Sequence, residues 1–236
     1  MMGHTHALSG SVTWLAVTPA LAAAGYPLGP LELGTSVLVA TGAALLPDMD
    51  HPDATVAQTY GPPSAGLAWV TNKISGGHRH ATHSVLFAAA AGVGAQALAY
   101  HTEIAALVAI VLMIGLGMRG LGFGVPSKRN TSALLNALAM VAIGFGLHYA
   151  GIAQWWLGPV LFVGCLTHLA GDSITTAGCP LLWPWSQRMS LPLIPRTGGP
   201  IERWVVTPVL MVGLGALAVL QLPGRFLGDL LHLVRG

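Results

Sequence analysis

The histidines and acids of this chain fall into four short clusters, and the sequence between the clusters is almost entirely apolar. Ten histidines accompany only ten Lys or Arg and eight Asp or Glu among 236 residues. Imidazole and carboxylate groups are the usual ligands of zinc and similar divalent ions. The clusters therefore predict a metal site, and they comprise residues 4–6, 47–51, 78–84 and 168–172.

The fourth cluster has the clearest ligand spacing. His168 and Asp172 are four residues apart, so a helix presents both on one face, where they can reach one ion. The same spacing also suits a polar network at the end of a helix. Alone, the pair is a weak signal for a metal. The alternative is weakened because an acid near the membrane boundary costs free energy unless it has a partner.

The second cluster follows a predicted helix stop at Pro47. If this segment is extended, Asp48 and Asp50 point the same way and His51 points the opposite way. Two carboxylates on one side of the chain would suit a divalent ion. Taken alone, this cluster is explained better by ordinary turn chemistry after a helix, because Asp and Pro both favour turns.

The third and first clusters each offer one expected ligand. His83 stands between Thr82 and Ser84, either of which can cap the helix expected to follow. Nearby, Arg79 carries a planar fork of donors that suits phosphate or carboxylate. In the first cluster His6 lies nearest the expected helix start, so it is the preferred ligand there.

The composition is that of a membrane protein. Apolar residues make up 53% of the chain and charged residues only 8%, and the mean hydropathy is +0.67, whereas a soluble domain carries about a quarter charged residues. A formal charge of +2, with no basic run beyond Lys128-Arg129, predicts no nucleic-acid partner. The spacing of Cys165 and Cys179 fits neither a zinc nor a redox motif, so both are expected to be free thiols.

Long uncharged stretches predict an all-α fold, a polytopic transmembrane helix bundle forming a single domain over residues 1–236. A span needs about 20 apolar residues, and the sequence supplies about seven candidates, of which the second is short. Frequent Ala and Gly residues would let the helices approach closely. Two longer loops, 48–82 and 176–203, carry site residues. The expected spans are 7–24, 31–46, 84–100, 104–124, 131–150, 154–174 and 204–222.

With seven spans, the connections alternate between the two sides of the membrane, and one side collects most of the basic residues. The positive-inside tendency places that side in the cytoplasm, with the protein in the plasma (inner) membrane. The same side receives the N-terminus and all four clusters. Residues 20–24 resemble the end of a secretory signal peptide, but no Lys or Arg precedes them, so we expect this segment to be retained. The basic residues of this side are Lys73, Arg79, Lys128, Arg129, Arg188, Arg196 and Arg203.

Taken in order, these motifs resemble the YdjM-like family of membrane-bound, predicted metal-dependent hydrolases. The resemblance extends through most of the chain, and the Arg-x-x-Thr-His-Ser and His-x-x-x-Asp elements are the most specific. It implies a helical inner-membrane protein with metal-dependent hydrolase activity. The motifs are Thr5-His6 with Gly10, Leu45-Leu-Pro-Asp-Met-Asp50, His78-Arg79-x-x-Thr82-His83-Ser84, His168-x-x-x-Asp172, Thr175-Thr-x-Gly178 and Gly198-Gly-Pro-Ile-Glu202.

A more distant similarity is to zinc-dependent phospholipase C and related helical nucleases. Their order of an early His, an Asp, a later His and then His-x-x-x-Asp is similar to the order of the clusters in this chain. Those enzymes carry a further His-and-Glu ligand group, which has no counterpart here. Glu202 is the only late acid in a suitable loop, and no His accompanies it. One or two ions therefore fit better than three.

Our hypothesis from the sequence is that Asp50, His83, His168 and Asp172 hold one divalent ion, most simply zinc, with manganese or another ion as alternatives. His6, with Asp172 as a bridge, would help to hold a second ion. Asp48 or Glu202 would act as general base, and Arg79 would neutralise a phosphate. The ion would activate water for hydrolysis. The expected substrate is a phospholipid or another amphipathic ester reached from the bilayer, and the expected site residues are His6, Asp48, Asp50, Arg79, His83, His168, Asp172 and Glu202.

Two other classes of function compete with a hydrolase. A divalent-metal transporter or sensor would need ionisable residues along its spans, whereas a structural metal site would close its coordination shell. The sequence leaves open the substrate, the metal, the number of ions and the oligomeric state. It also leaves open the roles of His4, His51, His78 and His80.

Overall fold

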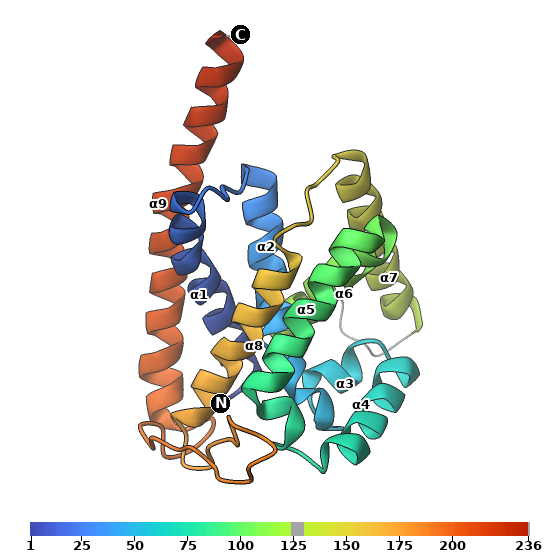
Figure 1. Ribbon diagram of the computed structural model, residues 1–236, viewed down its shortest axis with the longest axis vertical. Coiled ribbons are helices and arrows are strands. Elements are labelled where there is room, and N and C mark those ends of the chain that lie inside the picture. The colour runs from blue at the N-terminus through green and yellow to red at the C-terminus, as the bar shows by residue number, and fades with distance from the viewer. Residues whose placement is uncertain (124–129, 236) are drawn as a thin grey trace.

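The computed structural model describes residues 1–123 and 130–235, and in these residues it contains helices, turns and two isolated bridges but no strand (Figure 1). Lys128 and Arg129, which the orientation argument used, lie outside the described residues. The elements are α1 Gly3–Ala23, α2 Pro30–Ala43, η1 Leu46–Asp50, α3 Thr55–Thr59, α4 Pro62–Ser75, η2 Ala81–His83, α5 Val85–His101, α6 Glu103–Gly120, α7 Asn130–Tyr149, α8 Leu157–Ser173, η3 Glu202–Val206 and α9 Thr207–Arg235.

A helix occupies each of the seven segments expected from the sequence. The expected short second span is α2, which ends at Ala43, and the chain then tightens into the 3₁₀ turn η1 with Pro47 near its start. A proline ring clashes with a continuing α-helix, which accounts for the break. One predicted cap is confirmed at the start of α5, where the Ser84 hydroxyl accepts from the Phe87 N–H at 3.1 Å.

The fold is an all-α membrane protein, but the number of crossings remains a prediction. Within the described residues, three helical segments are long and apolar enough to cross a bilayer: 30–50, 103–120 and 202–221. Two further apolar helices, 85–101 and 135–149, are shorter. Helices α1 and α8 carry more polar residues, and their position in the fold explains this composition.

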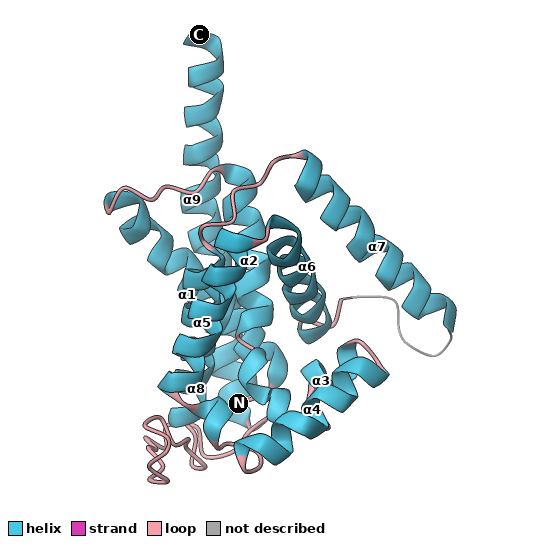
Figure 2. Ribbon diagram, turned by 45° about the vertical axis from the view of Figure 1, so that its right-hand side comes forward, coloured by secondary structure: helices cyan, strands magenta, loops and turns pink. Residues whose placement is uncertain are grey.

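Helix α8 lies at the centre of the bundle, packed against α1, α2 and α5 (Figures 1 and 2). Ten of its seventeen residues are buried, including His168 and Asp172. By contrast, α9 lies at the edge of the bundle. Its Leu214 and Leu217 pack against the core, whereas other large apolar residues such as Val209 and Val212 are 64% and 72% exposed. Apolar side chains on the outside and polar ones in the middle suit a lipid environment, in which polar groups must be satisfied internally.

Close helix contacts at small residues hold the central helices together. A Cβ atom added at Gly42 of α2 would lie 2.0 Å from the Met113 carbonyl oxygen of α6, and one added at Gly164 of α8 would lie 2.5 Å from the Cβ of Ala43. Small residues allow such approaches, and van der Waals contact drives helix association in a bilayer. These two contacts fix α6 and α8 against α2.

Buried hydrogen bonds fix α1 against α2. The Trp14 indole donates to the Ser36 hydroxyl at 2.8 Å, and the hydroxyls of Ser11 and Thr41 lie 2.6 Å apart. All four residues are buried, and polar pairs of this kind join helices where water is absent. They set the position of α1, and hence of His6 near its start.

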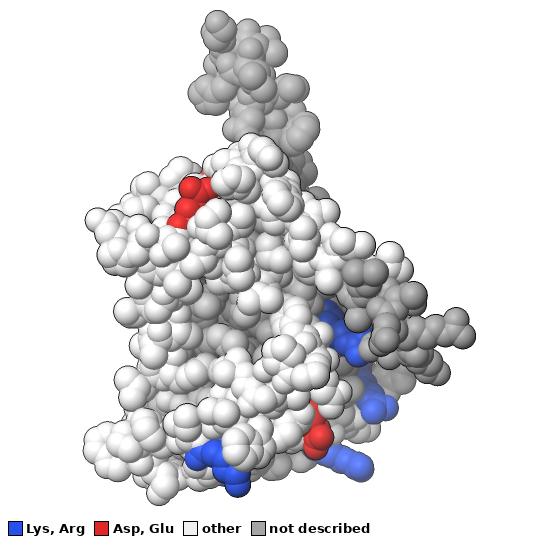
Figure 3. Space-filling view, turned by 90° about the vertical axis from the view of Figure 1, so that its right-hand side faces the viewer, with Lys and Arg blue, Asp and Glu red and all other residues white. Residues whose placement is uncertain are grey.

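The four clusters gather at one end of the bundle. The start of α1, the turns η1 and η2 and the end of α8 all lie at the lower end in Figure 1, where the segment between α8 and η3 folds across the bundle. On the face shown in Figure 3, the visible Lys and Arg side chains also lie in the lower half. This distribution agrees with the charge bias found in the sequence, while the orientation in the membrane remains a prediction.

Replacing Gly42 by Ala should destabilise the bundle, because the new Cβ would overlap the Met113 carbonyl oxygen. Overpacking of this kind costs about 1–3 kcal/mol. Gly34 on the same helix is the matched control, since a Cβ there meets nothing within 4 Å and alanine favours the helix by about 1 kcal/mol. Thermal unfolding in detergent, followed by circular dichroism, should show a lower midpoint for Gly42→Ala only. Equal midpoints for the two variants would contradict this packing.

Candidate metal centre

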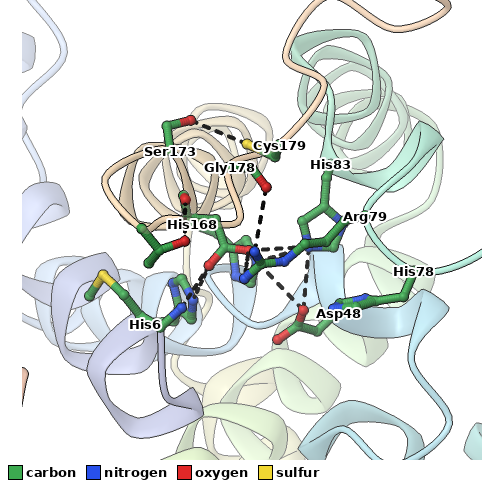
Figure 4. Close-up of polar contacts among 12 residues, drawn as sticks. His6, Asp48, His78, Arg79, His83, His168, Ser173, Gly178 and Cys179 are labelled. Carbon is green, nitrogen blue, oxygen red and sulfur yellow. Dashed lines mark hydrogen bonds and ion pairs between the residues drawn. The ribbon is translucent and has the colours of Figure 1, made fainter. Parts of the chain in front are cut away.

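Side chains from all four clusters converge at the lower end of the bundle. In Figure 4, His6 comes from α1, Asp48 from η1, His83 from η2 and His168 from α8, and all four are directed toward a common region. Two groups of possible donor atoms each lie within 4.8 Å of one another. The first group is Asp48, Asp50, His78 and His83, and the second is His6, His168 and Asp172.

Five of the six separations among four donor atoms drawn from both groups are close to those of a tetrahedral site. His83 Nε2 lies 3.3 Å from His168 Nε2, 3.4 Å from Asp48 Oδ1 and 3.6 Å from Asp172 Oδ2. His168 Nε2 lies 3.6 Å from Asp48 Oδ1 and 3.7 Å from Asp172 Oδ2. Ligands bound to zinc at ~2.0–2.2 Å in a tetrahedron are ~3.3–3.6 Å apart. These four residues, Asp48, His83, His168 and Asp172, therefore fit a single divalent ion, and we call them the candidate metal centre.

His168 is oriented by the backbone. Its Nδ1 lies 2.8 Å from the Ala44 carbonyl oxygen, which can only accept, so Nδ1 carries the proton and Nε2 keeps its lone pair. A hydrogen bond on the far nitrogen is the usual way in which a protein fixes a metal-binding histidine. As expected from the sequence, Asp172 lies on the same helix face, one turn later.

A hydroxyl relay orients His83 in the same manner. The Thr82 hydroxyl donates its only proton to Asp50 Oδ2 at 2.5 Å, so it accepts from His83 Nδ1, which is 3.1 Å away. His83 Nε2 then faces Asp48 and His168. Burial alone would lower the pKa of His83, but hydrogen bonds to Asp48 and Asp50 outweigh burial and raise the pKa to about 9. A cation that binds Nε2 would therefore displace a proton.

Asp50 belongs to the first donor group, but its carboxylate lies on the Nδ1 side of His83 and organises the loop around it. Its carboxylate accepts from the Thr82 hydroxyl, from the Arg79 backbone N–H at 3.0 Å and from His78 Nδ1 at 2.9 Å. The extended geometry considered for the second cluster is wrong, because η1 is a 3₁₀ turn. Residues two apart on such a turn point in different directions. Asp48, not Asp50, is thereby directed at His168.

His6 approaches Asp172 from the opposite side. Its ring stacks on His168 with 3.8 Å between the ring centroids, and its Nε2 lies 3.3 Å from Asp172 Oδ1. The Met1 amino nitrogen also donates to this oxygen, at 2.7 Å. His6 Nδ1 is buried without a hydrogen-bond partner. A buried polar atom of this kind calls for an explanation, and a bound ion or water near the ring would provide one.

Arg79 closes the other side of the centre. Its Nη2 lies 2.7 Å from Asp172 Oδ2 and its Nη1 donates to the Gly178 carbonyl at 3.4 Å. The backbone of Arg79 has φ +61°, the only positive φ at a non-glycine residue in the described part of the chain. Such a conformation costs roughly 1–2 kcal/mol, and the hydrogen bond from its N–H to Asp50 holds it in place.

Glu202 does not join this arrangement. It is fully buried, and its two carboxylate oxygens accept from the backbone N–H groups of Met2 at 2.6 Å and Gly198 at 2.7 Å. These bonds tie the start of α1 to the last loop. The sequence suggested an acid free to act as a base, because nothing in it indicated which backbone groups Glu202 would meet.

The structure shows the surroundings of several residues whose roles could not be predicted from the sequence. His78 pairs with Asp50, and the His51 ring meets the His78 ring edge-on at 4.6 Å. His80 is exposed on the loop before η2. The sequence predicts only a helix-capping role for Thr82. Its contact with Asp50, 32 residues away, is long-range and leaves no local signal in the sequence.

A cavity of about 300 Å³ adjoins the convergent donor atoms. Asp48, Asp172 and Arg79 all line it, and the Asp48 side chain is 23% exposed. The two histidines of the four-atom set, His83 and His168, are fully buried. The arrangement therefore has a closed histidine side, and solvent reaches it from the cavity chiefly at Asp48, since Asp172 is only 1% exposed.

Comparison with known proteins agrees with the motifs. The family model described as YdjM inner membrane protein matches residues 1–122 and 131–226, a range that contains every residue of the centre. The inner membrane protein YdjM of Escherichia coli (strain K12) is 35% identical over 81 residues, which is 32% of this chain and 39% of the relative, and the protein of the same name from Shigella flexneri matches equally. The aligned part thus spans about two fifths of these relatives. No solved structure matches the chain. The chain belongs to the YdjM family of inner membrane proteins.

Proposed function

We propose that this protein is a metal-dependent hydrolase whose ion is held by Asp48, His83, His168 and Asp172. The observation that carries this proposal is the separation of about 3.3–3.7 Å between each histidine Nε2 and the other donor atoms, beside a cavity. Zinc suits two imidazoles and two carboxylates, and manganese is the alternative. Compared with the hypothesis from the sequence, Asp48 takes the place of Asp50, and Asp50 orients His83 through Thr82.

The residues around the ion have distinct tasks in this proposal. A divalent ion bound there would supply an activated water and polarise the substrate. His6 stacks on His168 and binds Asp172 Oδ1, so it steadies the carboxylate and offers a ligand for a second ion. Arg79 places its guanidinium at the cavity wall, where it can neutralise a phosphate. Glu202 stays outside the catalytic set because both of its oxygens are already bonded.

The location of the centre favours a substrate with a phosphate or another ester group at the membrane surface. The cavity opens at the same end of the bundle as the basic side chains in Figure 3. A phospholipid or another amphipathic ester would reach it from the bilayer. The transporter alternative is less favoured, because the candidate ligands lie together at one end and do not form a path along the helices.

The structural-site alternative predicts a closed coordination shell. Here two of the four donor residues, Asp48 and Asp172, line the cavity, which leaves room for water and substrate beside the ion. An enzyme and a structural site therefore differ in one respect that can be measured, namely turnover by the metal-loaded protein.

Replacing His168 by Ala should abolish tightly bound metal, because it removes a buried donor and its hydrogen bond to Ala44. His101→Ala is the matched control, since His101 is exposed at the end of α5. Elemental mass spectrometry on detergent-purified protein should find one or two equivalents in the wild type and in the control, and close to none in His168→Ala. Asp48→Asn, which keeps the shape of the side chain, should lose the ion as well. Undiminished metal in both site variants would place the ion elsewhere.

The hydroxyl relay gives a second prediction. Thr82→Val keeps the shape of the side chain but cannot connect His83 to Asp50, so metal affinity should fall about 10–100-fold. Thr82→Ser retains the hydroxyl and should bind like the wild type. Competition with a chromophoric chelator measures both affinities. If Ser and Val weaken binding equally, packing at residue 82 matters and the relay does not.

Arg79 should affect turnover more than metal content. Arg79→Gln keeps a non-glycine residue at the same backbone conformation and removes the charge, so hydrolysis of a phosphodiester should fall about 100-fold with the ion retained. Arg188→Gln, at an exposed position on the same side, serves as control and should hydrolyse normally. A metal-loaded wild type that cleaves neither phosphodiesters nor lipid esters would refute the hydrolase and favour a structural or transport role.

A further inference from the structure

Helix α4 is built with its large apolar residues on the outside. Its inward face consists of small or polar residues: Ala68 and Ser75 are buried, and Asn72 donates to the Asp50 carbonyl at 2.7 Å. Its outward face carries large apolar residues with high exposure. These are Leu67 at 55%, Trp69 at 61%, Val70 at 42% and Ile74 at 80% exposed.

This distribution is the reverse of a helix that faces water. A surface helix of a soluble protein turns its apolar stripe inward, whereas the stripe 67, 70 and 74 of α4 follows the i, i+3, i+7 spacing on the outer side. Lys73 stands within this outer face and is also exposed. A long cationic side chain beside Trp and aliphatic residues is typical of a helix lying in a lipid–water interface.

The position of α4 brings it close to the lipid-facing surface of the bundle. The Tyr60 hydroxyl, just before α4, donates to the Leu112 carbonyl in the middle of α6. Helix α6 is one of the candidate spans, and Leu112 is itself 41% exposed. In Figure 2, α3 and α4 lie next to the lower end of α6 and extend away from the bundle axis. Helix α3 contacts both α6 and α4, so α4 lies close to the apolar surface of a candidate span.

We propose that α4 lies in the membrane interface, with Leu67, Trp69, Val70 and Ile74 in the lipid and Lys73 directed to anionic headgroups. The occupant of this face is the bilayer itself. The Asn72 side chain then links the lipid-bound helix to the backbone of Asp50, so the helix anchors the loop that orients His83. The inference does not depend on the hydrolase activity, since it concerns the surface beside the centre.

Depth-dependent quenching tests the placement. Ile74→Cys and Leu67→Cys each receive an environment-sensitive thiol label, and His80→Cys, exposed on the loop after α4, is the control. Cys165 and Cys179 are fully buried, and wild-type protein treated in parallel measures any background. The full chain is reconstituted in vesicles of phosphatidylcholine and phosphatidylglycerol, with or without brominated acyl chains.

The labels at 67 and 74 should lose about half of their fluorescence in brominated vesicles, since an interfacial helix lies ~5–10 Å into the headgroup–acyl boundary. The label at 80 should be quenched by aqueous iodide and not by bromine. If the labels at 67 and 74 behave like the label at 80, the face is in water and the proposal fails. If neither quencher reaches them, protein covers the face, for example a second copy of the chain, and the proposal fails as well.

Discussion

The hydrogen bond from His168 Nδ1 to the Ala44 carbonyl oxygen joins the two parts of the chain on which the centre depends. In a continuing α-helix the N–H of Asp48 would occupy that carbonyl. Because α2 ends at Ala43 and Pro47 follows in a 3₁₀ turn, the carbonyl is available to an imidazole from α8. One interruption of a helix therefore both aims Asp48 at the centre and fixes the histidine opposite it.

Much of the fold could be predicted from the sequence, because apolar runs without charge have few alternatives to a helix in a bilayer. The pair His168 and Asp172 could also be predicted, since residues four apart lie about one turn apart on the same helix face. Which carboxylate faces this pair could not be predicted from the sequence. Asp48 and Asp50 exchange roles according to whether the segment is extended or a 3₁₀ turn, and residue types alone do not decide between these conformations.

Two further roles could not be predicted because they depend on contacts between distant parts of the chain. Glu202 looked like a free acid, and its two backbone donors become visible only once the last loop is folded against the start of α1. Thr82 looked like a helix cap, but Ser84 takes that role and Thr82 connects His83 to Asp50. Both cases concern polar groups that must find a partner when buried, and the partner lies far away in sequence.

The donor residues of the centre are brought together from separate helix ends, and the bond between His168 and Ala44 alone closes a loop of 124 positions. A form in which η1, η2 or α8 is not yet packed lacks part of this set. Any cation that binds the set will therefore bind the finished arrangement in preference to incomplete ones and shift the folding equilibrium toward it by mass action. For such a cation, its supply and the completion of membrane assembly would be thermodynamically linked, whatever chemistry the assembled centre then performs.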